Sequence, residues 1–407
     1  MKIKVGVIFG GESVEHEVSI ISAIQAINKL DQEKYDIIPI YITKKREWYT
    51  GNMLKDIEVY KDLSLIKKYG KNVVLYEKDG SFVLQNKRFP HNVITDIDIA
   101  FPIVHGTNVE DGVLQGYLQT IGIPFVGGDV YASVVGQDKV FMKDIFASAG
   151  LPMSKYTWFY DCDYKNDRES VLADIKKLKF PVIVKPSATG SSVGIKVADN
   201  VDELKEAIDD AMQYDDKILV EEVVPNLKEC NISVLGNYEH QKVSEIEEVI
   251  SASKFLTYDE KYVGGGKKLK GGYKVPIKNG SKGMASANRK LPAEISDKLR
   301  KDIEDIAVKA FKNLGSAGVC RIDFLIDEKA KKAYINEINS IPGSLAFYLW
   351  EAKGVNYSDL LDDLINIGVK NYKKRISKTH SFDTNILKGF AANGGVKGMK
   401  GMKGKLR

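Results

Sequence analysis

The chain has 407 residues, enough for two or three domains, and its 43% hydrophobic and 28% charged residues are ordinary for a globular enzyme. The net charge of +5 is small for this length, so bulk electrostatics do not indicate a nucleic-acid partner. The three cysteines stand far apart without a CxxC pair, which disfavours a disulfide framework or a zinc site and favours a reducing compartment. No apolar run is long enough for a signal peptide or a transmembrane helix, so we expect a cytoplasmic protein.

The first third of the chain predicts an α/β unit that begins like a doubly wound fold. Residues 2–9 form an apolar strand that ends in the Gly10-Gly11 turn, and the next helix carries isoleucines on one side. Glu15 and Glu17 lie near the start of this helix, where they can complement its dipole. Because the full GxGxxG pattern is absent, no dinucleotide site is inferred. Further strands are expected at residues 35–42, 73–76, 81–84 and 97–104.

A polar glycine loop, residues 105–112, follows the last of these strands. Open α/β sheets place ligands at the carboxyl ends of their strands, so the loop is a candidate site. His105 stands at the strand tip rather than on an apolar helix face. Glu110 and Asp111 are interpreted as caps of the helix that begins at Val113.

A loop of small residues, 186–194, separates two short strands beyond the Gly150-Leu151-Pro152 break. It is not a Walker loop, because no GxxxxGK[ST] precedes a helix here. Such a loop can still fold its N–H groups over a phosphate chain, and Lys185 on the preceding strand adds a positive charge. The alternative is an ordinary hairpin turn.

Two more stretches have a composition that indicates function. Residues 258–293 are polar and rich in lysine and glycine, a pattern typical of a lid or a disordered segment. The last twenty residues carry six Lys/Arg and no acid, which indicates a flexible basic tail. The tail either has no function or is weakly attracted to anionic polymers or membranes.

Residues 318–343 carry the strongest pattern, which predicts two strands joined by a polar turn. Arg321 and Asp323 share one face of the first strand, and its other face is apolar. On the second strand, Glu337 and Asn339 are expected to share a face with Ile335. A turn centred near residue 330 would place Asp323 opposite Glu337 and Arg321 opposite Asn339. The resulting oxygen ligands suit Mg²⁺, and the alternative is a solvated polar face.

Three motifs together resemble the D-alanine–D-alanine ligases of the ATP-grasp superfamily. HGTNVEDGVLQGYL resembles one family signature, RID with NEINSIPG resembles the other, and VIVKPSATGSSVG lies between them in the right order. The resemblance covers about residues 1–372. It implies an α/β (α+β) ATP-grasp fold of three α/β domains, the first Rossmann-like, with ATP between the sheets of the other two. The expected divisions are an N-terminal preATP-grasp domain (1–137), a central subdomain (138–225), a C-terminal subdomain (226–372) and a tail (373–407).

The resemblance also implies a role for individual residues. Glu15 would bind the ammonium of the first D-alanine with His105 nearby, and Ser191 and Tyr262 would link Glu15 to the lid. Arg321 and the N–H of Gly343 would stabilise the tetrahedral intermediate. The residues expected to bind ATP are Lys139, Lys185, Gly190, Ser192, Gly194, Glu221, Glu229 and Lys261. Those expected to hold two Mg²⁺ (or Mn²⁺) are Asp323, Glu337 and Asn339, and those expected at the acceptor are Tyr348 and Leu349.

The activity that the resemblance implies is the ATP-dependent joining of two D-alanines for peptidoglycan synthesis, by a homodimer. A carboxylate is a poor acyl donor, so ATP first converts it to an acyl phosphate, which an amine then attacks. Acyl phosphates hydrolyse, so a lid that excludes water has a purpose.

Three features depart from the family pattern. Glu222 stands where a lysine is usual, the lid is long and contains GGGKKLKGG, and residues 344–350 read SLAFYLW. Tyr348 there replaces a serine that binds the carboxylate of the second D-alanine. The acceptor therefore stays open between D-alanine and D-serine, D-lactate or a more apolar amino acid. A nucleotide-binding scaffold without turnover is a further alternative.

Overall fold

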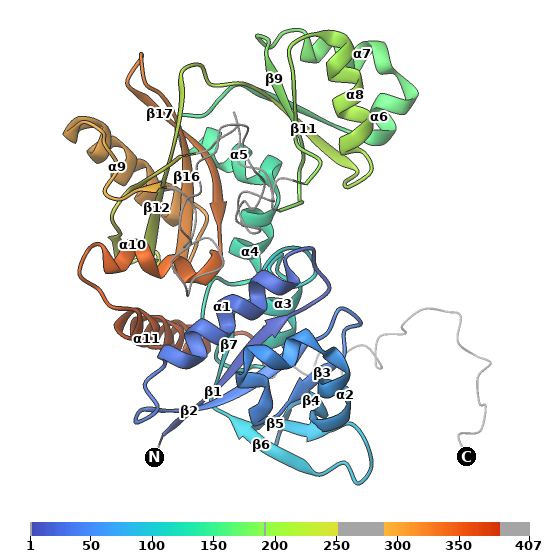
Figure 1. Cartoon of the computed structure of the whole chain (residues 1–407), viewed down its shortest axis with the longest axis vertical. Coiled ribbons are helices and arrows are strands. Elements are labelled where there is room, and N and C mark those ends of the chain that lie inside the picture. The colour runs from blue at the N-terminus through green and yellow to red at the C-terminus, as the bar shows by residue number, and fades with distance from the viewer. Residues whose placement is uncertain (1, 191–192, 251–288, 383–407) are drawn as a thin grey trace, which may run out of the picture. The chain divides into compact units, whose positions relative to one another are not determined.

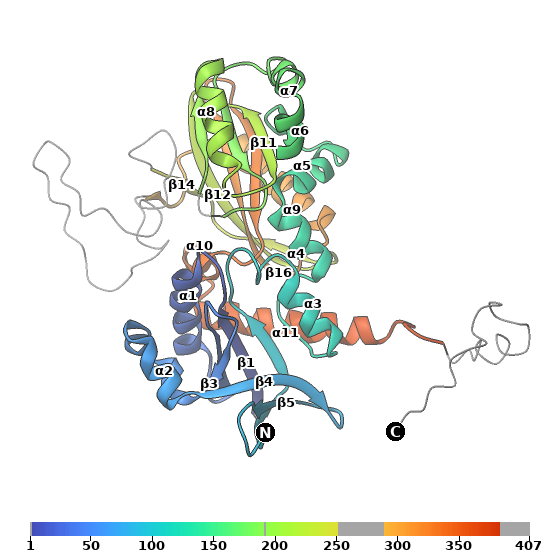
Figure 2. The same ribbon diagram turned by 90° about the vertical axis from the view of Figure 1, so that its right-hand side faces the viewer.

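Three β-sheets, each with its own hydrophobic cluster, organise the part of the chain that the computed structural model describes, residues 2–190, 193–250 and 289–382. All three sheets belong to the unit Met1–Val369 (Figures 1 and 2). The second unit, Lys370–Arg407, begins within helix α11 (Tyr357–Ile376). Among the described residues, no helix combines the length and the apolarity needed to cross a membrane.

The first sheet has the strand order β6-β5-β4-β3-β2-β1-β7. Its parallel part is β2 (Tyr35–Ile42), β1 (Ile3–Gly10) and β7 (Ile99–Pro102), and helix α1 (His16–Lys29) packs against β1. The other strands are antiparallel, so the doubly wound character that the sequence suggested is limited to three strands. They are β3 (Trp48–Thr50), β4 (Lys71–Lys78), β5 (Ser81–Asn86) and β6 (Val93–Ile97). The remaining helices of this region are η1 (Asn52–Lys55), η2 (Ile57–Lys61), α2 (Leu63–Tyr69), α3 (Val113–Thr120) and α4 (Val130–Gln137).

The second sheet is antiparallel in the order β10-β9-β11-β8. Helices α6 to α8 pack on it, and their apolar side chains complete its hydrophobic cluster (Figure 1). The strands are β8 (Tyr156–Tyr160), β9 (Val182–Pro186), β10 (Lys196–Ala198) and β11 (Lys217–Glu222). The helices are α6 (Asp161–Asn166), α7 (Arg168–Ile175) and α8 (Val201–Ala211).

The third sheet has the order β15-β14-β12-β16-β17, with β13 (Gln241–Val243) paired to β12. Its strands are β12 (Leu227–Gly236), β14 (Glu247–Val249), β15 (Arg289–Lys290), β16 (Gly318–Asp327) and β17 (Lys332–Asn339). Helix α9 (Asp297–Asn313) covers one face and closes the core. The helix begins after Ser296, because that side chain accepts a hydrogen bond from the Leu299 N–H and caps it.

Helix α5 (Lys139–Ser148) contributes Met142 and Phe146 to the hydrophobic cluster of the third sheet, not to that of the second. The domain boundary expected at residue 138 therefore lies between α4 and α5. The expected division assigns α5 to the central subdomain, whereas its apolar side chains pack in the core of the third sheet. The four domain limits remain a prediction.

The hairpin of β16 and β17 has the predicted register, with Asp323 opposite Glu337 and Arg321 opposite Asn339. A β-bulge follows, because Phe324 pairs with Ile335 and Asn336 is the extra residue. Ile335 is consequently buried in the core, and the expectation that it shares the polar face was wrong. The alternation was read without the bulge, which shifts the phase of β17 by one residue.

Candidate active site

The polar face of the β16–β17 hairpin is built around an arginine–carboxylate pair. Arg321 donates from Nε and Nη2 to the two oxygens of Asp323, at 2.7 and 2.8 Å. Asn339 donates from Nδ2 to Asp323 Oδ2 at 3.2 Å. Two parallel bonds from one guanidinium give a strong and directional pair, so the carboxylate is held in one orientation.

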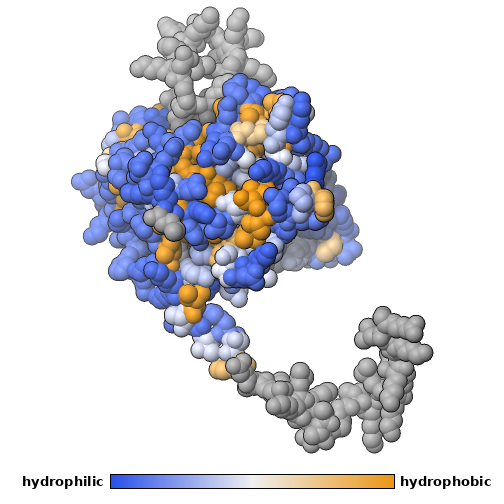
Figure 3. Space-filling model, turned by 90° about the horizontal axis from the view of Figure 1, so that it is seen from below, coloured by the Kyte–Doolittle hydropathy of each residue, from blue (hydrophilic) through white to orange (hydrophobic). Residues whose placement is uncertain are grey.

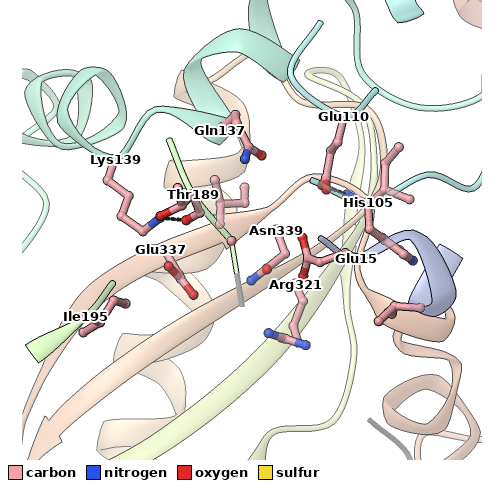
Figure 4. A pocket seen from close by; sticks show the side chains of 16 residues that line it. Glu15, His105, Glu110, Gln137, Lys139, Thr189, Ile195, Arg321, Glu337 and Asn339 are labelled. Carbon is pink, nitrogen blue, oxygen red and sulfur yellow. Dashed lines mark hydrogen bonds between the residues drawn. The ribbon is translucent and has the colours of Figure 1, made fainter. Parts of the chain in front are cut away.

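One pocket brings this face together with loops from the rest of the chain (Figure 4). Lys139 and Glu337 lie toward one end, Glu15 and His105 toward the other, and Arg321 between them. Residues from five separate parts of the sequence thus line one site. Its lining also includes Glu110, Gln137, Thr189, Gly190, Ile195, Asn339 and Gly343.

His105 is buried and joins two distant loops through a serine. Its Nε2 lies 3.0 Å from Ser22 Oγ, which also accepts a hydrogen bond from the Ser344 N–H at 2.8 Å. Burial lowers the pKa of His105 below its ordinary value. Ser22 therefore connects His105, which follows β7, with the turn after Gly343.

Glu110 does not cap helix α3, contrary to the sequence interpretation, because Gly112 occupies the N-cap position. Its carboxylate instead accepts hydrogen bonds from Gly106 N, Ser340 Oγ and Ile341 N at 2.8–2.9 Å. Burial, with a contribution from Glu15, raises the pKa of Glu110 to about 7. Two of these partners, Ser340 and Ile341, are 230 and 231 residues away, so no local pattern predicts the contact.

Glu15 lies against two glycines that have no room for a side chain. A Cβ on Gly190 would be 2.6 Å from Glu15 Oε2, and one on Gly106 would be 2.9 Å from the same atom. The small-residue loop thus reaches Glu15 directly. The predicted site residues Ser191, Ser192, Lys261 and Tyr262 lie outside the described residues, so their roles stay predictions.

The start of α5 anchors the small-residue loop. Lys139 donates from Nζ to Thr189 O at 2.7 Å and from its backbone N to Ser187 O at 3.0 Å. Asp138 caps the helix and also accepts from Ser187 Oγ at 2.6 Å and from Lys217 Nζ at 2.6 Å. These hydrogen bonds fix the backbone of the loop at Ser187 and Thr189, just before its glycines.

Lys185 and Glu221 form part of a buried triad with Lys143, which the sequence reading did not single out. Glu221 Oε1 lies 2.5 Å from Lys143 Nζ, and Oε2 lies 2.7 Å from Lys185 Nζ. Burial opposes ionisation, but the two lysines hold the pKa of Glu221 well below its usual range. Lys185 also donates to the bulge residue Asn336 at 3.1 Å. Glu221 thus orients Lys185, and its expected contact with adenine or ribose stays a prediction.

A second pocket, of about 530 Å³, lies between the link after β11 and strands β12 and β14. Glu229 lines it together with Val224, Lys228 and Glu248. This volume is within the range of small-molecule sites. Glu222 does not line this pocket. Its carboxylate accepts a hydrogen bond from the Lys179 N–H at 3.0 Å.

The segment that the sequence left open, residues 344–350, docks onto the third sheet. Ser344, Leu345 and Ala346 have φ of 53°, 53° and 49°, a left-handed turn that is uncommon for residues with a Cβ. Helix α10 (Phe347–Glu351) follows, and Tyr348 Oη donates to Glu247 Oε1 at 3.0 Å. The buried Leu349 accepts from the Glu245 N–H at 3.2 Å.

Comparisons with known proteins agree with this geometry. Two family descriptions match the chain, "D-ala D-ala ligase N-terminus" over residues 4–128 and "D-ala D-ala ligase C-terminus" over residues 145–366. The chain belongs to the D-alanine–D-alanine ligase family. It is 39% identical over 386 residues to the D-alanine–D-alanine ligase of Thermosipho africanus, covering 95% of this chain and 98% of that relative. It is 38% identical over 387 residues to that of Natranaerobius thermophilus, covering 94% and 99%.

Solved structures of ligases have the same fold as this family member. The D-alanine–D-alanine ligase from Coxiella burnetii superposes with a TM-score of 0.76 at 27% identity, covering 96% of this chain and 98% of that one. The VanG D-Ala:D-Ser ligase from Enterococcus faecalis superposes with a TM-score of 0.73 at 29% identity, covering 90% and 100%. The ATP-grasp fold expected from the sequence is confirmed.

The chemistry of the hairpin suits the divalent metal that ligases of this family use with ATP. Asp323 and Glu337 offer carboxylate oxygens and Asn339 an amide oxygen, which are the hard ligands that Mg²⁺ prefers. Cα pairing places Asp323 beside Glu337 across the hairpin. Within the described ranges, no group of three or more His, Cys, Asp or Glu gathers as a metal cluster. Mg²⁺ is usually bound by one or two carboxylates together with substrate phosphates, so phosphate oxygens would complete the coordination. Asp323 would share its oxygens between the metal and Arg321.

Proposed function

We propose that this chain is an ATP-dependent D-alanine–D-alanine ligase that makes the dipeptide for peptidoglycan synthesis. One observation carries the proposal. A single pocket has Glu15 and His105 toward one end and Lys139 and Glu337 toward the other, with Arg321 between them. We assign the first end to the amino acid and the second to the phosphates. The near full-length similarity to curated ligases supports the same reaction.

The phosphate end is built to receive ATP. Lys139 and Lys185 contact the phosphates as positive charges, and Glu221 keeps Lys185 ionised and aimed at the site. The small-residue loop, with Gly190 and Gly194, closes over the phosphates. Asp323, Glu337 and Asn339 would hold two Mg²⁺, which would supply positive charge against the phosphate oxygens. The nucleoside occupies the pocket lined by Glu229.

The amino-acid end positions the first D-alanine. Glu15 binds its ammonium group, because it is a buried carboxylate that faces the pocket. The substrate carboxylate then lies toward Arg321 and the phosphates. Its oxygen attacks the γ-phosphorus of ATP, the bond to the β-phosphate breaks, ADP leaves and an acyl phosphate forms. Attack by the second amine creates an oxyanion that Arg321 and the Gly343 N–H stabilise, and phosphate leaves. One such donor is typically worth about 3 kcal/mol in the transition state.

Localisation and assembly are part of the proposal. We place the enzyme in the cytoplasm, where ATP and D-alanine are available, and we propose a homodimer. Exposed apolar side chains on α3 and α4 support self-association: Val113, Tyr117, Tyr131 and Val134. Hydrophobic side chains also interrupt the hydrophilic surface in Figure 3.

A ligase of the same mechanism with another acceptor is the second candidate. Tyr348 in place of the usual serine favours it, as does the structural similarity to a D-Ala:D-Ser ligase. D-Serine, D-lactate and more apolar amino acids are the acceptors to compare with D-alanine.

The test is a phosphate-release assay with ATP, Mg²⁺ and D-alanine, followed by mass analysis of the product. D-Alanyl-D-alanine as the main product is the expected result. Phosphate release that requires another acceptor would favour the second candidate, and no release with any pair would overturn both.

A further inference from the structure

A second guanidinium, half-buried, lies on the third sheet, on the opposite side of Arg321 from Glu337. The strand order β15-β14-β12-β16-β17 puts Arg289 on one edge strand and Glu337 on the other, with Arg321 between them. Arg289 donates from Nη1 to Glu247 Oε2 at 3.0 Å, and its side chain is only 13% exposed. Arg289 is therefore a cation at the edge of the sheet that lies opposite Glu337 and the proposed phosphate end.

Glu247 is the residue that organises this cluster. Its side chain is 2% exposed and receives hydrogen bonds from Asn231 Nδ2, Tyr348 Oη and Arg289 Nη1, each at 3.0 Å. Asn231 pairs with Glu247 on β14 and with Asp323 on β16. Only the strand that carries Asn231 therefore separates Glu247 from Asp323. A buried carboxylate with three donors fixes its partners as well as itself.

The hydroxyl of Tyr348 is committed to this carboxylate. A phenol has one O–H to donate, and here it donates to Glu247 Oε1. Burial raises the pKa of Tyr348, so the hydroxyl keeps its proton. An O–H already bonded to a buried carboxylate cannot also donate to a substrate carboxylate. The tyrosine consequently does not substitute for the hydroxyl of a serine at this position.

The ring of Tyr348 has a different contact. The Arg289 guanidinium carbon lies 4.1 Å from the centre of the ring, a cation–π arrangement. Ring and carboxylate together hold the guanidinium in one plane, and a guanidinium has five N–H donors in a fork that matches a carboxylate. Arg321 has another role in the proposed mechanism, since its Nε and Nη2 hold Asp323 and it stabilises the oxyanion.

We propose that Arg289 binds the carboxylate of the acceptor amino acid, and that Glu247 and Tyr348 are positioning residues that hold it there. The inference rests on the proposed ligase function and specifies its acceptor subsite. The acceptor is then recognised by its α-carboxylate, a group that D-alanine, D-serine and D-lactate share. An amine that lacks a free carboxylate, such as D-alaninamide, is a poor acceptor.

The test compares four variants by phosphate release, with D-alanine varied to separate the KM of the second site from that of the first. Arg289→Ala should raise the second KM by about 30-fold or more, because removing a buried charged partner of a ligand costs about 2–5 kcal/mol. The first KM and the KM for ATP should change little. Arg289→Lys should recover part of the loss. Tyr348→Phe, which keeps the ring, should change the second KM by about threefold or less.

The matched control is Lys290→Ala on the same strand, because Lys290 forms an exposed pair with Glu294 and should leave every constant unchanged. Circular dichroism and a thermal melt of each variant separate a folding defect from a binding defect, and Arg289→Lys serves if the alanine variant does not fold. With D-alaninamide as acceptor, the unmodified enzyme and Arg289→Ala should be equally poor.

Two results would overturn the inference while leaving the ligase function intact. One is a normal second KM in Arg289→Ala, and the other is a loss in Tyr348→Phe as large as that in Arg289→Ala. Absence of phosphate release by the unmodified protein with every carboxylate-bearing acceptor would instead overturn the proposed function, and this inference with it.

Discussion

Arg321 holds both carboxylate oxygens of Asp323, at 2.7 and 2.8 Å, on the face of the hairpin that lines the pocket. The pair joins two tasks in the proposed mechanism, since Asp323 is a metal ligand and Arg321 stabilises the intermediate. A change in one residue is therefore expected to disturb the other.

Replacing Arg321 with alanine should reduce turnover by a factor of about 10²–10³ or more, because the oxyanion loses a fixed cation. Binding of ATP should persist, since Lys139 and Lys185 remain. Phosphate release measures the first effect and a fluorescent nucleotide titration the second. Arg168→Ala, which removes an exposed contact with Asp209 and a cation–π contact with Tyr164, is the control. Full turnover in Arg321→Ala would contradict the proposed role.

Replacing Gly190 with alanine should weaken binding of the first D-alanine. The added Cβ would lie 2.6 Å from Glu15 Oε2, so the carboxylate or the loop must move. We expect the KM of the first site to rise by about tenfold, with a smaller effect on the KM for ATP. Gly116→Ala is a matched control, because its Cβ meets nothing within 4 Å in helix α3 and should stabilise the fold slightly. Equal constants for both variants would count against the close contact with Glu15.

Replacing Glu110 with glutamine should change how stability depends on pH. Burial raises the pKa of this carboxyl from 4.5 in the unfolded chain to about 7 in the folded protein, so the folded state binds the proton more tightly. Its contribution is therefore full below pH 4.5 and is lost as pH rises through about 7, a difference of roughly 3 kcal/mol. Urea unfolding at pH 5 and pH 8 should show a smaller fall in free energy for Glu110→Gln than for the unmodified protein. A parallel fall in both proteins would refute the assignment.

Removing the Glu221 carboxylate should destabilise the fold more than removing one of its lysines. Glu221→Gln leaves Lys143 and Lys185 buried without their anion, which typically costs about 3–5 kcal/mol. In Lys143→Met, Lys185 still neutralises Glu221 and the apolar side chain fills the site, so the loss should be smaller. Free energies of unfolding in urea give the comparison. Asp174→Asn, at an exposed pair with Lys177, should change stability by about 0.5 kcal/mol or less.

Local patterns predicted the elements and the hairpin register well, because they depend on neighbours in the sequence. Alternation along 318–339 placed Asp323 opposite Glu337, and only the bulge at Asn336 escaped it. A single extra residue in one strand leaves no mark on composition or charge, so the alternation continued to look regular.

The contacts that the sequence did not predict join residues that are far apart along the chain. Glu110 bonds to Ser340 across 230 residues, and Tyr348 bonds to Glu247 across 101. Glu110 had been interpreted as a helix cap because capping is the commonest use of an acid before a helix. Neither Glu247 nor Arg289 stands in a motif, and their neighbours on adjacent strands become known only when the strand order is known.

The sequence by itself determined the family, the strand–loop–helix order, the polar face of the hairpin and the kinds of group that we propose for the ATP site. Each of these depends on residues close together along the chain. Only the tertiary structure decided which charges pair. In the structure Asp323 pairs with Arg321, Glu221 pairs with two lysines, and Tyr348 donates a hydrogen bond to Glu247. A side chain bonds to whatever packing brings within about 3 Å, and packing is set by sheets whose strands are far apart in sequence.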